Sequence, residues 1–494
     1  MRFKNILLGF SLSCIIVLSA CEKIIDVEPE YSKDGSQIFT TLNDYEFALT
    51  GAYGLFRQVG YYGSGAQSTG AWSTLPDFMA DDQVETAEDL GNWVGQTDWV
   101  YAADDADISV SWLAAYSVIA QSNITLRNIE QFSATEAKKV NRIKGQALAI
   151  RAMAHFDVLR YWAVDYDRNS TALGIPYVTA VDIELKPSRL SVKESYDNIL
   201  KDLTEAETLL ADVDRPVNSG TSALTSRAFI DQLAVRGILA RVNLYAKDYV
   251  KAEEYATLVI TARPLATKAA FPEIWKDASA SEVLWSVPFN AGEGSPSSNG
   301  HLANSNRNRF RPSTSLTSLF DQTNDIRFNS YVASRATGAT APILPFAAHP
   351  RKIVNKFIGR GTFLDNLVRW QVLRTAEMYL IRAEARAMQG GAKAVLALAD
   401  LNELRSARIN NYVPSVATGQ ALLDEILTER RKELFGEGHR WFDLKRTSRT
   451  VNRTDCGTAS QCTLAPASRA WIWPIPQTEI DANENISAQQ SPGY

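Results

Sequence analysis

Apolar residues recur at three- and four-residue spacing along several stretches of this 494-residue chain, and the stretches come in pairs. Such spacing places the apolar side chains on one face of a helix, so each stretch predicts an amphipathic α-helix. The predicted helices span residues 111–131, 136–162, 191–212, 225–246, 249–262, 370–389, 392–409 and 419–435. The sequence therefore predicts a mainly α fold made of helical hairpins.

Two of these pairs have the features of tetratricopeptide-like hairpins. Near Lys247 one predicted helix ends and the next begins at once, with Tyr245, Tyr249 and Ala252 at the spacing of such a hairpin. In the other pair, glycines at positions 390 and 391 separate the two helices. Because the repeats are degenerate, we expect a helical-hairpin scaffold over about residues 111–262 and 370–446 rather than a regular array.

Two long stretches lack helical periodicity and are rich in aromatic residues. They cover about residues 51–109 and 264–369. Long irregular segments in a compact protein are typically binding loops or disordered, and a high aromatic content favours order. We therefore expect the binding surface to lie in these two loop-rich regions.

The N-terminus has the pattern of an export signal. Arg2 and Lys4 precede an apolar run, residues 6–18, that is too short to span a bilayer as a helix. The run leads into the sequence LSAC, whose cysteine, Cys21, stands where a bacterial lipoprotein is acylated. We expect residues 1–20 to be a lipoprotein signal peptide and residues 21–494 to form a single domain anchored to the membrane by lipid only.

Charge and cysteine content exclude several classes of protein. Loss of Arg2 and Lys4 would change the formal charge from −5 to −7, and the absence of a basic run argues against a nucleic-acid partner. Beyond Cys21, the mature chain would retain only Cys456 and Cys462. In an oxidising compartment this pair predicts a disulfide, and two thiols without a nearby histidine make a zinc site improbable.

The segment Glu429–Arg446 crowds acidic, basic and aromatic side chains together. On a helix, Arg430 falls in the middle of an apolar face, with Glu433 and Glu437 toward one edge. A buried guanidinium must be paired, because an uncompensated buried charge costs several kcal/mol. With Trp441 as a packing anchor, we interpret this segment as a structural clamp rather than a catalytic site.

A second helix, residues 136–162, carries a similar buried charge. Asp157 lies within an apolar stripe and should find a buried partner. His155 lies off that stripe, so we expect it at the rim. The four histidines show no metal-ligand spacing, and the sequence contains no nucleophile or phosphate-loop motif.

We expect no cofactor. The acidic residues Asp81, Asp82 and Glu85 are a candidate calcium site, although a solvated acidic loop is the better interpretation of them. Glycoside hydrolysis by two carboxylates stays open, since acidic residues are plentiful and no pair stands out.

With these residues in hand, the chain resembles the SusD/RagB family of outer-membrane lipoproteins. The resemblance rests on the lipoprotein signal and on five segments spread over the chain. They are GQALAIRAMAHFDVLRYWAVDYDRNSTALGIPYV, SLFDQTNDIRFNSYV, RTAEMYLIRAEARA, ERRKELFGEGHRWFDLKR and WIWPIPQTEIDANENISAQQSPGY. It implies a non-enzymatic protein at the cell surface, with tetratricopeptide-like hairpins on one side and irregular ligand loops on the other. It also implies that the protein captures oligosaccharides and delivers them to a SusC-like TonB-dependent transporter. The acidic residues Glu22, Asp26, Glu28 and Glu30 are compatible with the surface-export signals of this family.

The ligand residues of the family form no motif that can be carried over, so we predict them from physical chemistry. Aromatic rings stack on the apolar faces of sugars, while amides, carboxylates and guanidinium groups bind the hydroxyls. The candidates are Trp72, Trp93, Trp99, Arg307, Arg309 and Phe310. We expect at least one of the three tryptophans to be exposed.

Three alternatives stay open from the sequence. A peptide could occupy the same aromatic surface as an oligosaccharide. The protein could instead be a surface glycoside hydrolase, or an assembly scaffold whose hairpins bind only another protein.

Overall fold

The computed structural model describes residues 38–65, 70–182, 184–213, 222–296, 301, 307–338, 340–360 and 365–494. The chain divides into a small unit, residues 1–47, and a large unit, residues 48–494. Both predicted scaffold stretches and both predicted loop-rich regions lie in the large unit. The predicted signal peptide, Cys21 and the acidic residues that follow it lie outside the described residues.

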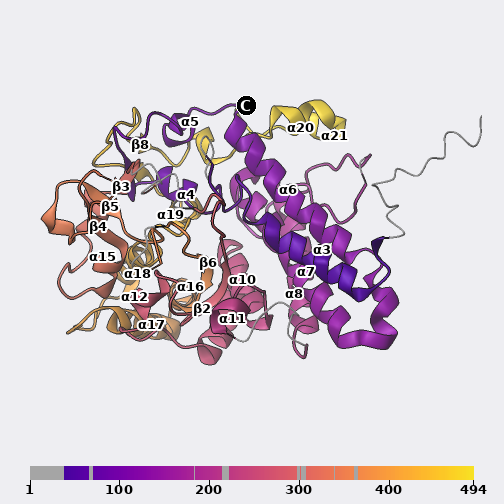
Figure 1. The fold of residues 1–494 in the computed structure, drawn as a ribbon, viewed down its shortest axis with the longest axis horizontal. Helices are drawn as coiled ribbons and strands as arrows, with labels where there is room; N and C mark the ends of the chain where they lie inside the picture. Colours follow the sequence, from indigo (N-terminus) through magenta and orange to yellow (C-terminus); the bar gives the residue numbers. More distant parts are fainter. Residues whose placement is uncertain are drawn as a thin grey trace, which may run out of the picture. The chain divides into compact units, whose positions relative to one another are not determined.

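Long helices make up the frame. They are α3 (Leu42–Leu55), α6 (Ala106–Leu126), α7 (Ser133–Trp162), α8 (Val192–Leu209), α10 (Gln232–Tyr245), α11 (Tyr249–Ala262), α16 (Thr375–Gln389), α17 (Ala392–Arg408) and α18 (Gly419–Glu433). In the large unit, α6 packs on α7, α7 on α8, α10 on α11, and α16 on α11, α17 and α18. Figure 1 shows α6, α7 and α8 side by side on the right. The prediction of a mainly α fold made of helical hairpins is therefore confirmed.

Local sequence sets where these helices begin and end. The side chains of Asp105, Asp231 and Asp248 accept hydrogen bonds from backbone N–H groups in the first turns of α6, α10 and α11. Ser191 and Glu194 form a capping box at the start of α8. Gly390, with φ of 70°, ends α16 in a conformation that a residue with a side chain rarely adopts.

Short elements connect and cover the frame. The short helices are α4 (Leu75–Phe78), α5 (Val94–Thr97), α9 (Ala223–Ser226), α12 (Phe271–Ile274), α14 (Thr314–Thr317), α15 (Ile326–Tyr331), α19 (Arg440–Arg446), α20 (Gln477–Ala482) and α21 (Glu484–Ser487), with 3-10 turns η1 (Ile129–Phe132), η2 (Phe346–Ala348) and η3 (Arg469–Trp471). The strands are β1 (Gln83–Glu85), β2 (Val283–Val287), β3 (Phe310–Pro312), β4 (Val332–Ser334), β5 (Lys352–Val354), β6 (Trp370–Arg374), β7 (Val451–Asn452) and β8 (Thr463–Leu464). Each strand joins an antiparallel pair, β1 with β3, β2 with β6, β4 with β5, and β7 with β8.

Residues 370–374 correct one helix prediction. The sequence predicted a helix over 370–389, but the first five residues form β6, which pairs with β2 from Val283 opposite Arg374 to Val287 opposite Trp370. Both strands are buried along their whole length. The strand, WQVLR, runs directly into α16, and five residues are too few for periodicity to distinguish a buried strand from the first turn of a buried helix.

The C-terminal segment packs on the end of α7. The backbone N–H of Trp473 donates to the carbonyl of Tyr161 at 3.0 Å, and the indole N–H of Trp162 donates to the carbonyl of Pro474 at 2.8 Å. The rings of Tyr161 and Trp473 stack with centroids 3.7 Å apart. Segments more than 300 residues apart in the chain therefore share one aromatic core.

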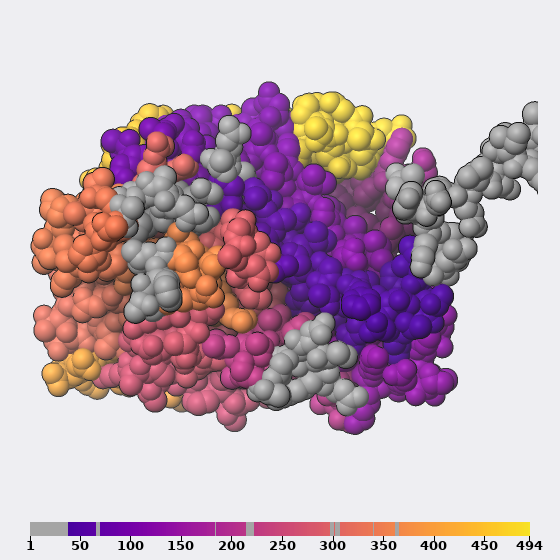
Figure 2. Space-filling view, viewed as in Figure 1, coloured from indigo at the N-terminus to yellow at the C-terminus, as the bar shows by residue number. Residues whose placement is uncertain are grey.

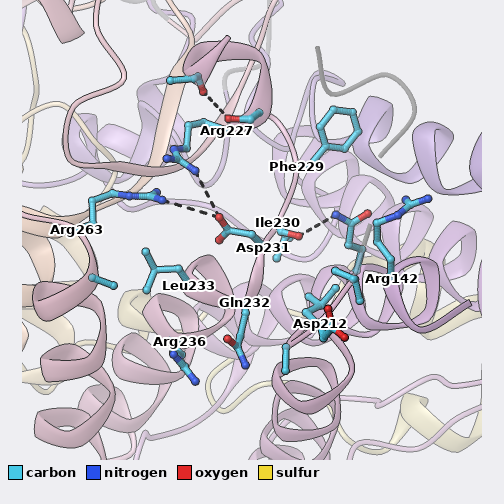
Figure 3. Close-up of a pocket in the computed structure, with 17 residues that line it drawn as sticks. Arg142, Asp212, Arg227, Phe229, Ile230, Asp231, Gln232, Leu233, Arg236 and Arg263 are labelled. Atoms are coloured by element: carbon cyan, nitrogen blue, oxygen red, sulfur yellow. Dashed lines mark hydrogen bonds and ion pairs between the residues drawn. The ribbon is translucent and has the colours of Figure 1, made fainter. Parts of the chain in front are cut away.

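The cavities in the described part of the large unit include the following three. The arginine cavity, of about 760 Å³, lies among α7, α9, α10 and the ends of α8 and α11, and Figure 3 shows its lining. A second cavity, of about 580 Å³, lies between residues 164–167 and the C-terminal segment. The amide pocket, of about 500 Å³, lies in the second loop-rich region, among α12, α15 and residues 355–359. In Figure 2 that region, in orange, forms the left edge of the molecule.

Candidate functional site

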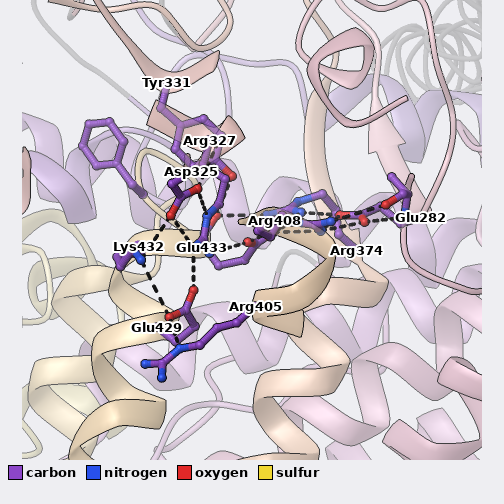
Figure 4. A network of polar contacts seen from close by, with 12 residues as sticks. Glu282, Asp325, Arg327, Tyr331, Arg374, Arg405, Arg408, Glu429, Lys432 and Glu433 are labelled. Atoms are coloured by element: carbon purple, nitrogen blue, oxygen red, sulfur yellow. Dashed lines mark hydrogen bonds and ion pairs between the residues drawn. The ribbon is translucent and has the colours of Figure 1, made fainter. Parts of the chain in front are cut away.

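The carboxyl-terminal charges form a buried ion network. It links α15, α17, α18 and β6, and we call it the charge cluster. Its members are Glu282, Asp325, Arg327, Arg374, Arg405, Arg408, Glu429, Lys432 and Glu433 (Figure 4). Glu433 sits at the centre, with carboxylate oxygens 2.9 Å from Arg327, 3.0 Å from Arg374 and 3.1 Å from Arg408.

The electrostatics of the charge cluster keep Glu429 and Glu433 ionised. Burial alone would raise the pKa of Glu429, but Arg327, Lys432 and Arg405 lower it to about 2. Burial likewise opposes ionisation of Glu433, and the guanidinium groups of Arg408, Arg374 and Arg327 bring its pKa well below the usual range. A carboxylate held ionised by three guanidinium groups is a poor proton donor, so this geometry suits packing rather than acid catalysis.

Arg430 is buried and paired, but with partners other than the expected ones. Its guanidinium lies 2.8 Å from Asp443 and 3.8 Å from Glu377, whereas Glu437 pairs with Lys356 and Arg374. The sequence placed Glu433 and Glu437 within reach of Arg430 on one helix. The chain instead turns after α18 and brings α19 back against it, so Asp443 supplies the carboxylate.

Trp441 and Asp157 are buried as well. Trp441 packs on Trp471, with ring centroids 4.3 Å apart. Asp157 accepts a hydrogen bond from the hydroxyl of Tyr61 at 2.7 Å and pairs with Arg160 one turn away. Asp157 thus has the buried partners that its place in an apolar stripe requires.

His155 corrects the expectation of a rim residue, because its side chain is fully buried. Its Nε2 accepts a hydrogen bond from the backbone N–H of Val178 at 3.0 Å, and its ring stacks on Tyr177 at 3.8 Å. Burial, joined by the charge of Arg151, lowers the pKa of His155 to about 3. The segment after α7 folds back over the polar side of the helix, which periodicity within the helix does not reveal.

The three tryptophans predicted to contact ligand are buried, with exposed fractions of 2% for Trp72, 1% for Trp93 and 7% for Trp99. The indole N–H of Trp72 donates to the carbonyl of Asp157 at 2.9 Å, and that of Trp99 donates to the carbonyl of Met79 at 3.0 Å. The expectation that one of them is exposed is therefore wrong. In this protein these rings build the core beneath the loops instead of presenting a face to solvent.

The structure does bring three of the predicted residues together. Phe310 stacks on Phe78 with centroids 3.8 Å apart, and the guanidinium of Arg309 lies 5.2 Å from the ring of Trp93. Nearby, burial and the charge of Glu85 raise the pKa of Asp89 to about 6. Phe310 and Arg309 are buried like Trp93, and of the six candidates only Arg307 is exposed.

The acidic residues predicted as a candidate calcium site are neither solvated nor grouped. Asp81 pairs with Arg440 at 2.7 Å, Asp82 pairs with Arg431 at 2.5 Å, and Glu85 accepts from the hydroxyl of Thr97. All three carboxylates are buried, so the interpretation as a solvated loop is wrong. Within the described ranges, no group of three or more His, Cys, Asp or Glu residues could hold a metal ion.

Cys456 and Cys462 form the expected disulfide, with Cα atoms 5.5 Å apart. Across the residues that the structure describes, no helix is both long and apolar enough to cross a lipid bilayer.

The amide pocket is an open site in the second loop-rich region, lined by both polar and apolar side chains. Three asparagines from different segments line it, namely Asn329 at the end of α15, Asn355 after β5 and Asn410 after α17. Trp275 also lines it, and its buried indole N–H has no hydrogen-bond partner among the described residues. Neutral donors and acceptors on convergent segments are suited to bind a hydroxyl-rich ligand. The sequence marked this region for binding, but it did not single out the amides.

The comparisons with known proteins agree with this architecture. A family model described as the SusD family matches residues 345–494, and one described as starch-binding and associating with the outer membrane matches residues 36–244. SusD-like protein P38 of Formosa agariphila is 23% identical over 514 residues, which cover 91% of this chain and 93% of that protein. The starch-binding protein SusD of Bacteroides thetaiotaomicron is 36% identical over 142 residues, 28% of this chain and 24% of that protein.

Solved structures lead to the same assignment. A SusD superfamily crystal structure from Bacteroides thetaiotaomicron, 29% identical, superposes with a TM-score of 0.78 over 92% of this chain and 100% of that chain. The fold and the pockets define the class of protein. It has a tetratricopeptide-like helical frame, and the irregular segments that the frame carries contain open pockets. Within that class, the chain belongs to the SusD/RagB family.

Proposed function

We propose that this protein is a surface lipoprotein that binds oligosaccharides and delivers them to a SusC-like TonB-dependent transporter of the outer membrane. Cys21 carries the lipid, and the protein performs no catalysis. Family membership is the observation that carries this proposal, because one matching model is described as starch-binding and associating with the outer membrane. A relative that matches the chain is also named for starch binding.

The amide pocket is the proposed oligosaccharide site. Sugar hydroxyls donate and accept hydrogen bonds, and the side-chain amides of Asn329, Asn355 and Asn410 can do both. A volume of about 500 Å³ falls within the range of ligand pockets. The indole N–H of Trp275 is a further donor in need of a partner.

The lining of the pocket supports binding rather than hydrolysis. Glycosidases use two carboxyl groups that face each other across the scissile bond. The amide pocket has a single carboxylate in its lining, that of Asp325. Its oxygens are 2.7 Å from Arg327 and 3.1 Å from Lys432, which hold it in the charge cluster.

Calorimetry on the full-length protein in detergent tests the proposal, with neutral oligosaccharides and peptides as titrants. We expect an oligosaccharide to bind, and Asn355→Ala to weaken that binding about 10-fold, the effect of losing about 1.4 kcal/mol of hydrogen bonding. The matched control is Asn198→Ala, which removes an amide on α8 whose Nδ2 donates to the carbonyl of Glu194 in the same helix at 2.9 Å. Binding of peptides without any oligosaccharide would overturn the proposal, and an unaltered affinity in Asn355→Ala would place the site elsewhere.

The anchor and the partner are tested separately. Cys21→Ala should move the protein from the membrane fraction to the soluble fraction, because no acyl chain can then be attached. Wild-type protein should co-purify with a large outer-membrane barrel. Membrane retention of the variant would contradict lipidation at Cys21.

A further inference from the structure

The amide pocket contains a recessed hydrogen-bond donor. Trp275 lines the pocket and is 3% exposed, and its indole N–H has no hydrogen-bond partner among the described residues. The ammonium of Lys356 lies 4.0 Å from the centroid of this ring, and Tyr331 and Phe357 pack edge-to-face on it. Because a buried donor without an acceptor is costly, the site favours a ligand that brings an acceptor to this N–H.

The charges around the pocket favour a neutral acceptor over a carboxylate. Among the described lining residues, Lys276 is the cation, and its Nζ lies 2.8 Å from Glu273. Asp325 is the carboxylate of the lining, and it engages the nearby Arg327 and Lys432. These cations already have anionic partners, so the recessed donor is better matched by a carbonyl oxygen than by an anion.

The same lining offers an acceptor and an apolar wall. Nδ2 of Asn355 donates to the backbone carbonyl of Asn329 at 3.3 Å, and no described residue donates to its Oδ1. Ile343 packs against the apolar cluster that contains Ile358, and these two side chains form the isoleucine wall of the pocket. A secondary acetamide has three complementary groups, a carbonyl oxygen for the indole N–H, an N–H for Oδ1 and a methyl for the isoleucine wall.

We propose that the amide pocket recognises a 2-acetamido sugar, with its carbonyl toward Trp275, its N–H toward Asn355 and its methyl on the isoleucine wall. The inference rests on the proposed function, because it names the class of oligosaccharide that the same pocket binds. An acetamido group projects farther from a sugar ring than a hydroxyl does, so it reaches a recessed donor that a hydroxyl does not. The exposed amide of Asn410 is left for the ring hydroxyls.

Calorimetric titration of the full-length protein with two β-1,4-linked trisaccharides, of N-acetylglucosamine and of glucose, tests the inference. These ligands differ only in the group at carbon 2 of each ring. We expect the N-acetylglucosamine trisaccharide to bind at least 10-fold more tightly. Trp275→Phe keeps an aromatic ring but removes the N–H, and it should abolish most of that preference. Ile343→Thr should reduce the preference about 4-fold, the effect of one buried methylene.

Trp285→Phe is the matched control. Trp285 is fully buried in β2, and its indole N–H also lacks a partner among the described residues, but it is not one of the residues that line the amide pocket. This variant should keep the preference. With nitrogen-15-labelled tryptophan, the indole resonance that is missing from Trp275→Phe should move downfield when the N-acetylglucosamine trisaccharide is added to wild type.

A third titrant and the melting temperatures of the variants make the outcomes distinct. A peptide carries the same amide groups, so N-acetyl-trialanine amide binding as tightly as the N-acetylglucosamine trisaccharide would overturn the sugar assignment. Equal affinity for the two trisaccharides, or a preference that survives Trp275→Phe, would overturn the inference. If Trp275→Phe melts early, Ile343→Thr and the indole resonance decide, and no change in either counts against it.

The inference and the proposed function fail separately. If neutral oligosaccharides bind without regard to the acetamido group and binding stays sensitive to Asn355→Ala, the proposed function stands without the inference. If no saccharide binds, both fall.

Discussion

The charge cluster and the amide pocket are neighbours, but the polar side chains of the cluster are paired and buried, whereas those of the pocket line an open volume. They meet at Asp325, which lines the pocket and pairs with Arg327 and Lys432 in the cluster. In the cluster, the central carboxylate of Glu433 is shared by three guanidinium groups and excluded from solvent. In the pocket, neutral amides line an open volume.

This difference in burial separates residues that stabilise the fold from residues that can contact a ligand. The dense run of charges near the end of the chain is a conspicuous candidate site in the sequence, but in the structure these charges pair with buried charges of the protein itself. The amides of the pocket are scattered, neutral and inconspicuous. High charge density is therefore a poor guide to a binding site when a mainly helical core has to fix long arginines and glutamates in place.

Removing the centre of the charge cluster should have the largest effect. We expect Glu433→Ala to lower the free energy of unfolding by about 3–5 kcal/mol, because three buried guanidinium groups lose a shared partner. Urea denaturation measures this change. Asp424→Ala, which breaks an exposed pair with Arg449, is the control and should cost less than about 1 kcal/mol. Equal effects for the two variants would remove the distinction between cluster and surface.

Acid should weaken the charge cluster. The folded-state pKa of Glu429 is lowered to about 2, below its value in the unfolded chain, so its stabilisation is full above the unfolded pKa and is lost as the pH falls toward 2. The contribution is on the order of 3 kcal/mol, from about 1.4 kcal/mol per pKa unit.

Denaturation of wild type and Glu429→Gln between pH 6 and pH 2 measures that loss. The variant should be less stable at pH 6 and should depend less on pH below about 4.5. Parallel curves for the two proteins would mean that Glu429 does not contribute to the acid sensitivity.

A substitution in the amide pocket should lower ligand affinity and leave the stability of the protein nearly unchanged. Asn410→Ala should weaken oligosaccharide binding by about 10-fold, or about 1.4 kcal/mol, and shift the melting temperature little, because Asn410 is exposed. Calorimetry and thermal unfolding on the same samples give both quantities. A large loss of stability with intact binding would make the pocket another part of the frame.

The smallest effect is expected at Arg307. It is the exposed member of the six residues predicted from sequence to contact ligand. Arg307→Ala should change stability by less than about 0.5 kcal/mol, as expected for an exposed surface residue. A clear loss of oligosaccharide affinity in this variant would extend the binding surface from the amide pocket to the loop that carries Arg307.

Sequence alone predicted the helical frame well. Helix α11 has the predicted bounds, and α7 and α17 differ from theirs by three residues or fewer. Such agreement is expected where amphipathic periodicity is sustained over several turns. Other predictions fit less well, since residues 111–131 correspond to α6 (Ala106–Leu126) and residues 225–246 to α10 (Gln232–Tyr245), and α3 (Leu42–Leu55) was not predicted. Residues 370–374 form β6, a five-residue strand whose partner, β2, lies more than 80 residues earlier in the chain.

The candidate sites were harder to predict, because they depend on contacts between distant segments. The sequence required a partner for Arg430, but Asp443 is selected by the turn that follows α18. Composition located the tryptophans in loop-rich regions and could not tell that Trp93 packs beneath Phe78 and Phe310. Asn355 and Asn410 belong to one pocket only because two loops meet at the end of α15.

The contact between the C-terminal segment and α7 bears on how the chain folds. Trp473 and Pro474 complete the environment of Tyr161 and Trp162, yet a ribosome makes them more than 300 residues later. Until the tail arrives, those rings lack their cover, and exposed aromatic surface makes incomplete chains prone to aggregate. We therefore expect a chain that ends before Trp473 to leave part of the Tyr161 and Trp162 rings uncovered and to aggregate more readily than the complete chain.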